Sequence, residues 1–234
     1  TATTEIYPLS LHDALPIPLH PLAERLRREV DGDVLFDRAS RGRYATDASI
    51  YQVEPVGVVI PRTADAAATA LQVAVDAGVP VLPRGAGTSQ CGQTVGAALV
   101  IDASRHLHRL VSLDAAARRA VVEPGMVLDT LNAQLRPHGL WFPVDVSTAA
   151  QATIGGMTGN NSCGARSMSY GSMVHRVAAI DACLADGTRG RFGPAAEITH
   201  PALRELSARA AALWAREKDE IEARFPKVSR RVAG

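Results

Sequence analysis

The sequence predicts an α/β protein, because strand-like and helix-like patterns alternate along its first half. Val56–Ile60 is a compact run of β-branched residues, typical of a buried strand. The segment Thr63–Ala77 has helical periodicity, with a threonine as N-cap and a glycine directly after it. Val79–Leu82 then begins another strand. A strand, a helix and a strand in this order form an α/β unit.

The N-terminal residues 1–17 do not fit the pattern that follows them. They contain no Lys or Arg, so they lack the basic region that starts a secretory signal. We expect residues 1–17 to be a foreign, adapter-like leader and residues 18–193 to form the main domain. Within that domain, apolar residues at helical spacing predict a short helix over about residues 21–31, whereas Arg41–Gln52 is polar and turn-rich.

The rest of the main domain adds strand patterns and one helix. Six runs predict strands: Leu99–Asp102, Leu110–Leu113, Arg119–Glu123, Leu140–Phe142, Val177–Leu184 and Thr188–Phe192. Leucines at helical spacing predict a helix over Leu128–Leu135. The composition changes after Gly193–Pro194, and one long charged helix is predicted from about Leu203 to Phe225. We expect residues 194–234 to be the helical start of a truncated C-terminal region.

Composition and charge exclude several classes of function. The 234 residues are 47% hydrophobic and 21% charged with a formal net charge of +1, as in an ordinary globular protein. The balanced charge gives no basic patch for nucleic acid, and aromatic residues, at 4%, are too few for base-stacking surfaces. No apolar run approaches the roughly 18 residues that cross a bilayer. The sequence therefore predicts neither nucleic-acid binding nor a transmembrane segment.

The three cysteines, Cys91, Cys163 and Cys183, are widely spaced and form no C-x-x-C pair. This stretch therefore encodes neither a zinc site nor an iron–sulfur cluster, and a disulfide framework is not expected. Free structural thiols in a reducing compartment fit this pattern best. We expect a cytoplasmic protein, with peripheral attachment to a membrane left open.

The first of two glycine-rich segments, Pro83-Arg-Gly-Ala-Gly-Thr-Ser89, follows a predicted strand. Successive N–H groups in such a turn can converge on one anion, because glycine has no Cβ to obstruct them. The spacing does not match the Rossmann G-x-G-x-x-G motif, and the irregular residues 88–94 supply no helix to carry a pyrophosphate. No Gly-Lys-Ser/Thr of a P-loop occurs either. By itself this segment is also compatible with a tight loop that binds nothing.

The second segment, Ala152-Thr-Ile-Gly-Gly-Met-Thr-Gly-Asn-Asn-Ser-Cys-Gly164, strengthens the case for a ligand. Paired glycines let backbone pass close to a flat group, and the asparagines and serine offer hydrogen-bond donors and acceptors. Alone, the segment is also compatible with a mobile surface loop. Two such segments in one domain favour a long phosphate-bearing ligand, and a dinucleotide is the expectation.

These segments carry a resemblance to a known family. Together with Pro143–Ser147, Tyr170–Gly171 and Val177–Gly187, their order resembles the PCMH-type FAD-binding domain of FAD-linked oxidases of the vanillyl-alcohol oxidase and p-cresol methylhydroxylase type. The chain looks most like the D-lactate, glycolate and D-2-hydroxyglutarate dehydrogenases fused to a C-terminal iron–sulfur module. The resemblance covers about Phe36 to the C-terminus. It implies an α/β fold of two subdomains with FAD extended between them.

The resemblance also implies a set of cofactor-binding residues. By position, the pyrophosphate would be cradled by Arg84, Gly85, Ala86, Gly87, Thr88 and Ser89. The rest of the cofactor would be lined by Ser147, Thr153, Ile154, Gly155, Gly156, Asn160, Ser162, Gly164 and Tyr170, with the backbone of Val177 near the adenine. Relatives with covalent flavin carry a histidine where this chain has Thr88, so non-covalent FAD is expected. Cys163 is expected to be a small buried packing residue and not an attachment point.

The resemblance implies oxidation of a D-2-hydroxy acid, with electrons passed to a quinone, a cytochrome or an iron–sulfur module in place of oxygen. In relatives the catalytic residues come largely from a C-terminal substrate domain that is not present here, so the catalytic residues are unknown and the fragment alone is expected to be inactive. An iron–sulfur cluster would belong only to a missing C-terminal module. A cell-wall-precursor reductase with the same cofactor domain and a stand-alone FAD-binding module remain alternatives.

The histidines are weaker candidates for a site. His106 and His108 are two apart and would share a strand face, where they could present two imidazoles to a metal. No third ligand lies near them in sequence, so solvent-facing side chains are favoured and no metal site is predicted. His175 lies close to the second glycine segment and could be a base, although ordinary hydrogen bonding is favoured.

Overall fold

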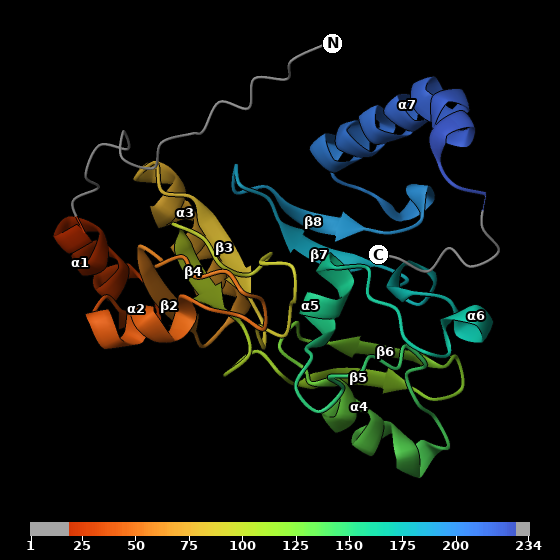
Figure 1. Cartoon of the computed structure of the whole chain (residues 1–234), viewed down its shortest axis with the longest axis horizontal. Helices are drawn as coiled ribbons and strands as arrows, with labels where there is room; N and C mark the ends of the chain where they lie inside the picture. The colour runs from red at the N-terminus through yellow and green to blue at the C-terminus, as the bar shows by residue number, and fades with distance from the viewer. Residues whose placement is uncertain (1–18, 228–234) are drawn as a thin grey trace.

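A four-stranded sheet forms the centre of the first half of the chain in the computed structural model, which describes residues 19–227 (Figure 1). The strand order is β1 (Gly32–Leu35), β2 (Gly57–Pro61), β4 (Leu99–Asp102) and β3 (Val81–Arg84). The last three strands are parallel, and β1 is antiparallel to β2. The α/β prediction is therefore confirmed.

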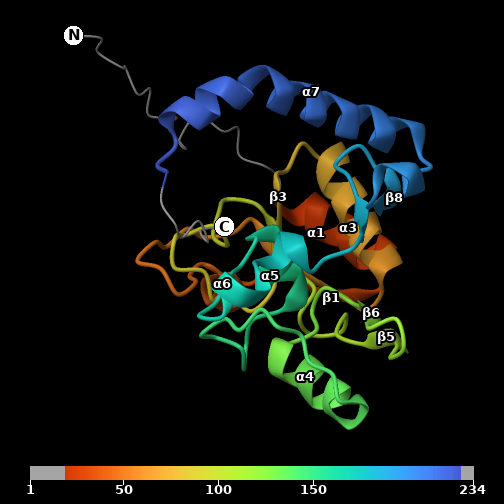
Figure 2. The same ribbon diagram turned by 90° about the vertical axis from the view of Figure 1, so that its right-hand side faces the viewer.

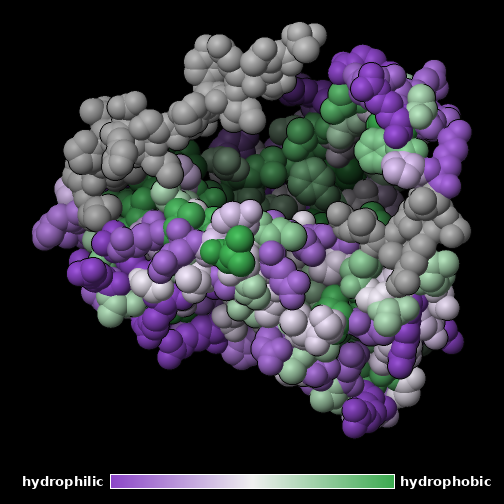
Figure 3. All heavy atoms as spheres, viewed as in Figure 1, coloured by the Kyte–Doolittle hydropathy of each residue, from purple (hydrophilic) through white to green (hydrophobic). Residues whose placement is uncertain are grey.

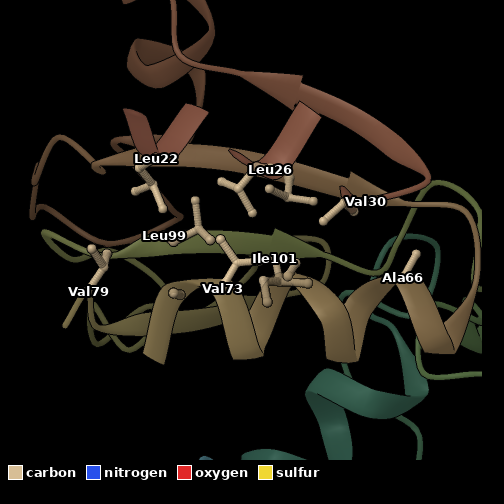
Figure 4. Close-up of a cluster of buried hydrophobic side chains, with 11 residues drawn as sticks. Leu22, Leu26, Val30, Ala66, Val73, Val79, Leu99 and Ile101 are labelled. Atoms are coloured by element: carbon tan, nitrogen blue, oxygen red, sulfur yellow. The ribbon is translucent and has the colours of Figure 1, made fainter. Parts of the chain in front are cut away.

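The two faces of this sheet are covered by different helices. The helices α1 (Leu19–Glu29) and α3 (Ala64–Asp76) share one core with the sheet, and Figure 4 shows Leu22 and Leu26 gathered with Val73 and Leu99. Alternate strand residues point to the other face, where α2 (Arg38–Tyr44) contacts β2. Because β2 is buried along its whole length, its continuous β-branched run is what a central parallel strand requires.

The second half of the chain builds a separate core from short elements. It contains the hairpin of β5 (Leu110–Asp114) and β6 (Arg119–Val122) and the helices α4 (Leu128–Leu135), α5 (Ile154–Gly159) and α6 (Ser167–Tyr170). Single 3₁₀ turns lie at Arg136–His138, Met173–His175 and Ala195–Glu197. The buried residues of this core are Met126, Leu128, Leu131, Leu135, Val144, Ala152, Ile154, Met157 and Met173.

A second hairpin and one long helix complete the described chain. The strands β7 (Ile180–Cys183) and β8 (Arg189–Phe192) pair antiparallel, and α7 (Pro201–Arg224) lies along one side of the molecule (Figure 2). The first turn of α7 is anchored by Leu203, which is 1% exposed and contacts the Cα of Gly190. Figure 3 shows hydrophobic side chains in a hollow on the face below α7. No helix within residues 19–227 has the length and apolar character needed to cross a bilayer.

Several sequence expectations are corrected by the structure. Leu140–Phe142 is irregular and not a strand, and the strand expected from Val177 begins only at Ile180. The elements β1, α2 and α5 were not expected, although α2 lies partly within the segment interpreted as turn-rich. The expected leader, residues 1–17, lies outside the described residues.

Candidate cofactor site

The first glycine segment lies at the carboxyl edge of the parallel strands. Arg84 ends β3 and pairs in register with Asp102, the last residue of β4. In open α/β sheets, ligands bind outside the carboxyl ends of the strands. The chain leaves the sheet here as the loop Gly85–Ser89, which therefore starts at the position where a ligand is expected.

The amides of Gly85–Ser89 are available to a ligand. None of the five donates a hydrogen bond to another group within residues 19–227. Gly87 has a φ of 70°, a left-handed conformation that lets neighbouring N–H groups turn toward one side. The loop therefore has the backbone chemistry of an anion cradle. The irregular backbone expected after it is confirmed, since residues 88–94 contain no helix.

The Arg84 side chain points into the protein. It is 9% exposed, and its guanidinium donates to the backbone carbonyls of Thr94 at 2.8 Å and Thr46 at 2.9 Å. It also lies over the ring of Tyr44, 5.7 Å from the ring centroid. The expected positive charge is thus present beside the loop, but two of its hydrogen bonds are made to the protein itself.

Next to Arg84, the half-buried Tyr44 and the buried Asp102 form a polar pair. The Tyr44 hydroxyl donates to Asp102 Oδ2 at 2.6 Å, and Asp102 Oδ1 accepts from the amide of Ser104 at 2.7 Å. Burial and then the hydrogen bond to Asp102 raise the pKa of the Tyr44 hydroxyl above its usual range. Tyr44 is therefore a protonated donor at neutral pH.

The second glycine segment contains the short helix α5 and not an open loop. Thr153 is its N-cap, and its hydroxyl accepts from the Gly156 amide at 3.3 Å. The amide of Ile154 donates to Met126 and that of Gly155 to Pro124, both at 2.8 Å. These first amides are engaged within the protein, unlike those of the first segment.

Packing explains the glycine at position 155. A Cβ there would lie 2.6 Å from Pro124 Cβ and 2.8 Å from its carbonyl oxygen. The side chains of Thr153 and Ile154 are 3% and 8% exposed, so both are buried. Their contribution to a site is therefore the placement of α5. Gly156 keeps more open space, with a Cβ there meeting only the Thr153 hydroxyl at 3.1 Å.

The structure brings the two glycine segments into contact. The Cα of Gly85 packs against Thr153 so closely that an added Cβ would overlap the Thr153 hydroxyl. Gln93 Nε2 donates to Asn160 Oδ1 at 2.9 Å, and Asn160 Nδ2 donates to Ser162 Oγ at 3.2 Å. Segments that are about 70 residues apart in sequence therefore form one surface.

Other expected residues lie further along that surface. Gly164 packs against Asp145, Ser147 is exposed in a turn, and the Tyr170 ring meets Trp141 edge-on at 5.3 Å between centroids. Val177 lines a cavity of about 500 Å³ with residues of β7, β8 and the end of α5. These residues therefore lie along several segments of the chain, and their side chains are not gathered around one place.

The remaining sequence candidates have ordinary surroundings. His106 and His108 lie in the turn after β4, so they do not share a strand face, and no cluster of three metal-ligating side chains occurs within residues 19–227. His106 is half-buried, and its Nε2 lacks a partner in this range. His175 Nδ1 accepts from the Ser172 amide at 3.1 Å, and Cys163 is half-buried.

The loop Thr46–Gln52 borders the candidate site, which the sequence did not indicate. The Ala48 amide donates to the Gly87 carbonyl at 3.1 Å, and Thr94 Oγ1 donates to Asp47 Oδ2 at 2.9 Å. These contacts hold the loop against the first glycine segment. Its polar, turn-rich composition indicated a loop but carried no sign of this partner.

Comparison with known proteins decides the family. Residues 55–193 match the sequence profile described as FAD binding domain, and this range includes both glycine segments. The chain belongs to the FAD-binding domain family.

The curated relatives of this FAD-binding domain act on hydroxy acids, by their names. D-2-hydroxyglutarate dehydrogenase of Pseudomonas putida is 36% identical over 219 residues, covering 87% of this chain and 21% of that protein. Glycolate oxidase subunit GlcD of Bacillus subtilis is 34% identical over 173 residues, covering 70% of this chain and 36% of that protein. The chain therefore spans about a fifth of the dehydrogenase and about a third of the oxidase subunit.

Solved structures share the fold of this FAD-binding domain. The wild-type BBE-like 1 protein of Physcomitrella patens aligns with a TM-score of 0.64 at 20% identity, over 76% of this chain and 38% of that one. An alkyldihydroxyacetonephosphate synthase aligns with a TM-score of 0.61 at 19% identity, over 68% of this chain and 32% of that one. The expectation of a two-subdomain α/β fold of the PCMH type is confirmed.

Proposed function

We propose that the chain binds FAD without a covalent bond, as the cofactor-binding part of a dehydrogenase that oxidises a D-2-hydroxy acid. The observation that carries the proposal is the row of amides at Gly85–Ser89 that donate to no group within the described residues 19–227, in a member of the FAD-binding domain family. The substrate class comes from the names of the relatives, which include D-2-hydroxyglutarate and D-lactate dehydrogenases and a glycolate oxidase subunit. Bound FAD would supply the two-electron oxidation, and the protein supplies its placement.

The first glycine segment would hold the pyrophosphate. Its five amides and the Thr88 hydroxyl are the donors that an anion needs, and they lie at the sheet edge where such ligands bind. Gly156 and Asn160 lie on the adjoining segment and would border the same cofactor. The cavity of about 500 Å³ beside Val177 would take the adenine end. The other expected residues, Ser147, Thr153, Ile154, Gly155, Ser162, Gly164 and Tyr170, would serve by shaping these segments.

The substrate class and the electron acceptor are proposed from the relatives and not from the geometry of this domain. The chain spans 21% and 17% of two dehydrogenases that it resembles, and the free amides among its described residues support a role in holding the cofactor. We assign it cofactor binding, with electrons leaving to a quinone, a cytochrome or an iron–sulfur module. Thr88 supports non-covalent attachment, because a hydroxyl cannot form a histidyl–flavin bond at that position.

Reconstitution tests the proposal directly. Purified protein is mixed with FAD, desalted and examined for the visible flavin spectrum, and is then precipitated with acid. We expect a yellow protein whose flavin is released into the acid supernatant. Riboflavin, which lacks phosphates, is the matched ligand control and should bind much more weakly. A protein that stays colourless would refute FAD binding, whereas flavin that precipitates with the protein would refute only the non-covalent attachment.

A further inference from the structure

We propose that Arg84 is a positioning residue, which braces the first glycine segment from inside the protein while the backbone amides alone contact the anion. This inference rests on the proposed function and deepens it. The guanidinium beside a phosphate-binding loop would ordinarily be assigned to the phosphate, because arginine is well suited to bind phosphate. The geometry around Arg84 points to a different role.

The first argument is where the guanidinium donates. Nη1 donates to the Thr94 carbonyl and Nη2 to the Thr46 carbonyl, at 2.8 and 2.9 Å. Thr94 ends the irregular run that continues from the first glycine segment, and Thr46 begins the loop Thr46–Gln52. One planar group with two fixed donors therefore ties the connection between β3 and β4 to the loop Thr46–Gln52, which a single flexible ammonium cannot do in the same way.

The second argument is the packing of the loop on the guanidinium. The Cα of Gly87 lies directly against it, so that an added Cβ would overlap Nη2. Gly87 is also the residue with a left-handed φ of 70°. The residue with the left-handed turn is thus seated on the Arg84 side chain, so the position of that side chain limits where the turn can lie.

The third argument is that further hydrogen bonds connect the same segments that the Arg84 side chain connects. The Ala48 amide donates to the Gly87 carbonyl at 3.1 Å, and Thr94 Oγ1 donates to Asp47 Oδ2 at 2.9 Å. With the guanidinium, these bonds close a ring from the first glycine segment to the loop Thr46–Gln52 and to the end of the irregular run at Thr94. Loss of Arg84 should therefore release the loop Thr46–Gln52 and the irregular run together.

Arg84→Lys and Arg84→Met separate the two roles. Lysine keeps the charge but loses the two-pronged geometry, whereas methionine loses both. As a positioning residue, Arg84 predicts that both variants weaken FAD binding by a similar factor of about ten or more, since hydrogen bonds to charged groups contribute on this scale. The loss should be equal at low and high salt, because no ion pair with the phosphates is removed. Arg119→Met, an exposed arginine on β6, is the matched control and should bind FAD normally.

Hydrogen exchange of the protein without FAD gives a second readout that does not depend on cofactor binding. Amides in residues 46–52 and 85–94 should exchange faster in both Arg84 variants, while α3 exchanges as in the unmodified protein and shows that the fold is intact. Thr94→Val, which removes only the bond to Asp47, should shift the same segments by less. Near-normal FAD binding by Arg84→Lys with loss in Arg84→Met, or unchanged exchange in both segments, would overturn the proposal. If the unmodified protein fails to bind FAD, the proposed function fails, and the exchange result still decides the role of Arg84.

Discussion

The contact between Gly85 and Thr153 joins the two glycine segments, and a double-mutant cycle can measure it. An alanine at position 85 would overlap the Thr153 hydroxyl, and Thr153 is buried with 3% exposure, so the side chain has little room to turn aside. Overpacking of this kind costs about 1–3 kcal/mol. Thr153→Ala alone removes the N-cap of α5 and should cost about 1 kcal/mol.

The double variant should be at least as stable as Gly85→Ala alone, although it carries two substitutions. With the hydroxyl gone, the nearest atom of residue 153 to the new methyl group is its Cβ at 3.4 Å, which is an ordinary contact. The two changes together should then cost about 1 kcal/mol, the loss of the cap, in place of an additive sum of about 2–4 kcal/mol. The coupling energy of the cycle is therefore expected to be about 1–3 kcal/mol in favour of the double variant.

Urea unfolding followed by circular dichroism supplies the four free energies of the cycle. Gly42→Ala is the control for a glycine-to-alanine change, because a Cβ at that helical position meets nothing within 4 Å. It should leave stability unchanged or raise it by about 0.5–1 kcal/mol. Additive losses in the Gly85 and Thr153 cycle would refute the direct contact between the glycine segments.

Two further predictions concern the second half of the chain. Gly155→Ala should lower the free energy of unfolding by about 1–3 kcal/mol, because its Cβ would lie 2.6–2.9 Å from atoms of Pro124. Gly159→Ala is the control, because a Cβ there meets nothing within 4 Å, and it should be near neutral. Equal losses of the two variants in urea unfolding would contradict this difference. The hydrogen bond from Arg109 holds the pKa of the Glu123 carboxyl below its usual range, so its stabilisation is present above about pH 4.3 and is lost as the pH falls through the lowered pKa. Unfolding midpoints measured between neutral and acidic pH should therefore fall less steeply for Glu123→Gln, and an unchanged slope would count against this assignment.

The elements with strong local signals were predictable from the sequence. The helix α3 was predicted within one residue at each end because Thr63 caps it and Gly78, with a φ of 67°, ends it. The buried strand β2 was also predictable, because a continuous run of β-branched residues is typical of a strand that is covered on both faces.

The helix α5 was not predicted because its amino-acid composition disfavours a helix. Three of its six residues are glycine, which disfavours a helix by up to about 1 kcal/mol each. Contacts with Pro124 and Met126, about 30 residues earlier in the chain, hold it in place. Such contacts leave no periodic signal within the segment itself, so a local interpretation as a loop was wrong for a physical reason.

The contacts of Arg84 could not be predicted from the sequence either. The sequence places a cation beside a glycine-rich loop that is suited to an anion, which by itself indicates a phosphate contact. Its acceptors are backbone carbonyls 10 and 38 residues away, and a carbonyl is present at every position of the chain. Only the fold determines which carbonyls the guanidinium meets.

The two glycine segments look alike in sequence, but their glycines have different structural roles. In the first segment, Gly85 and Gly87 let the loop rest on Thr153 and Arg84, and the amides of this loop donate to no group in the part of the chain that the structure describes. In the second, Gly155 lets α5 approach Pro124, and its own amide is used in that contact. Capacity to bind an anion therefore follows the number of amides left unpaired and not the number of glycines. By that measure the first segment is the better candidate to hold the charged part of the proposed ligand, and the second segment provides the surface on which the first one packs.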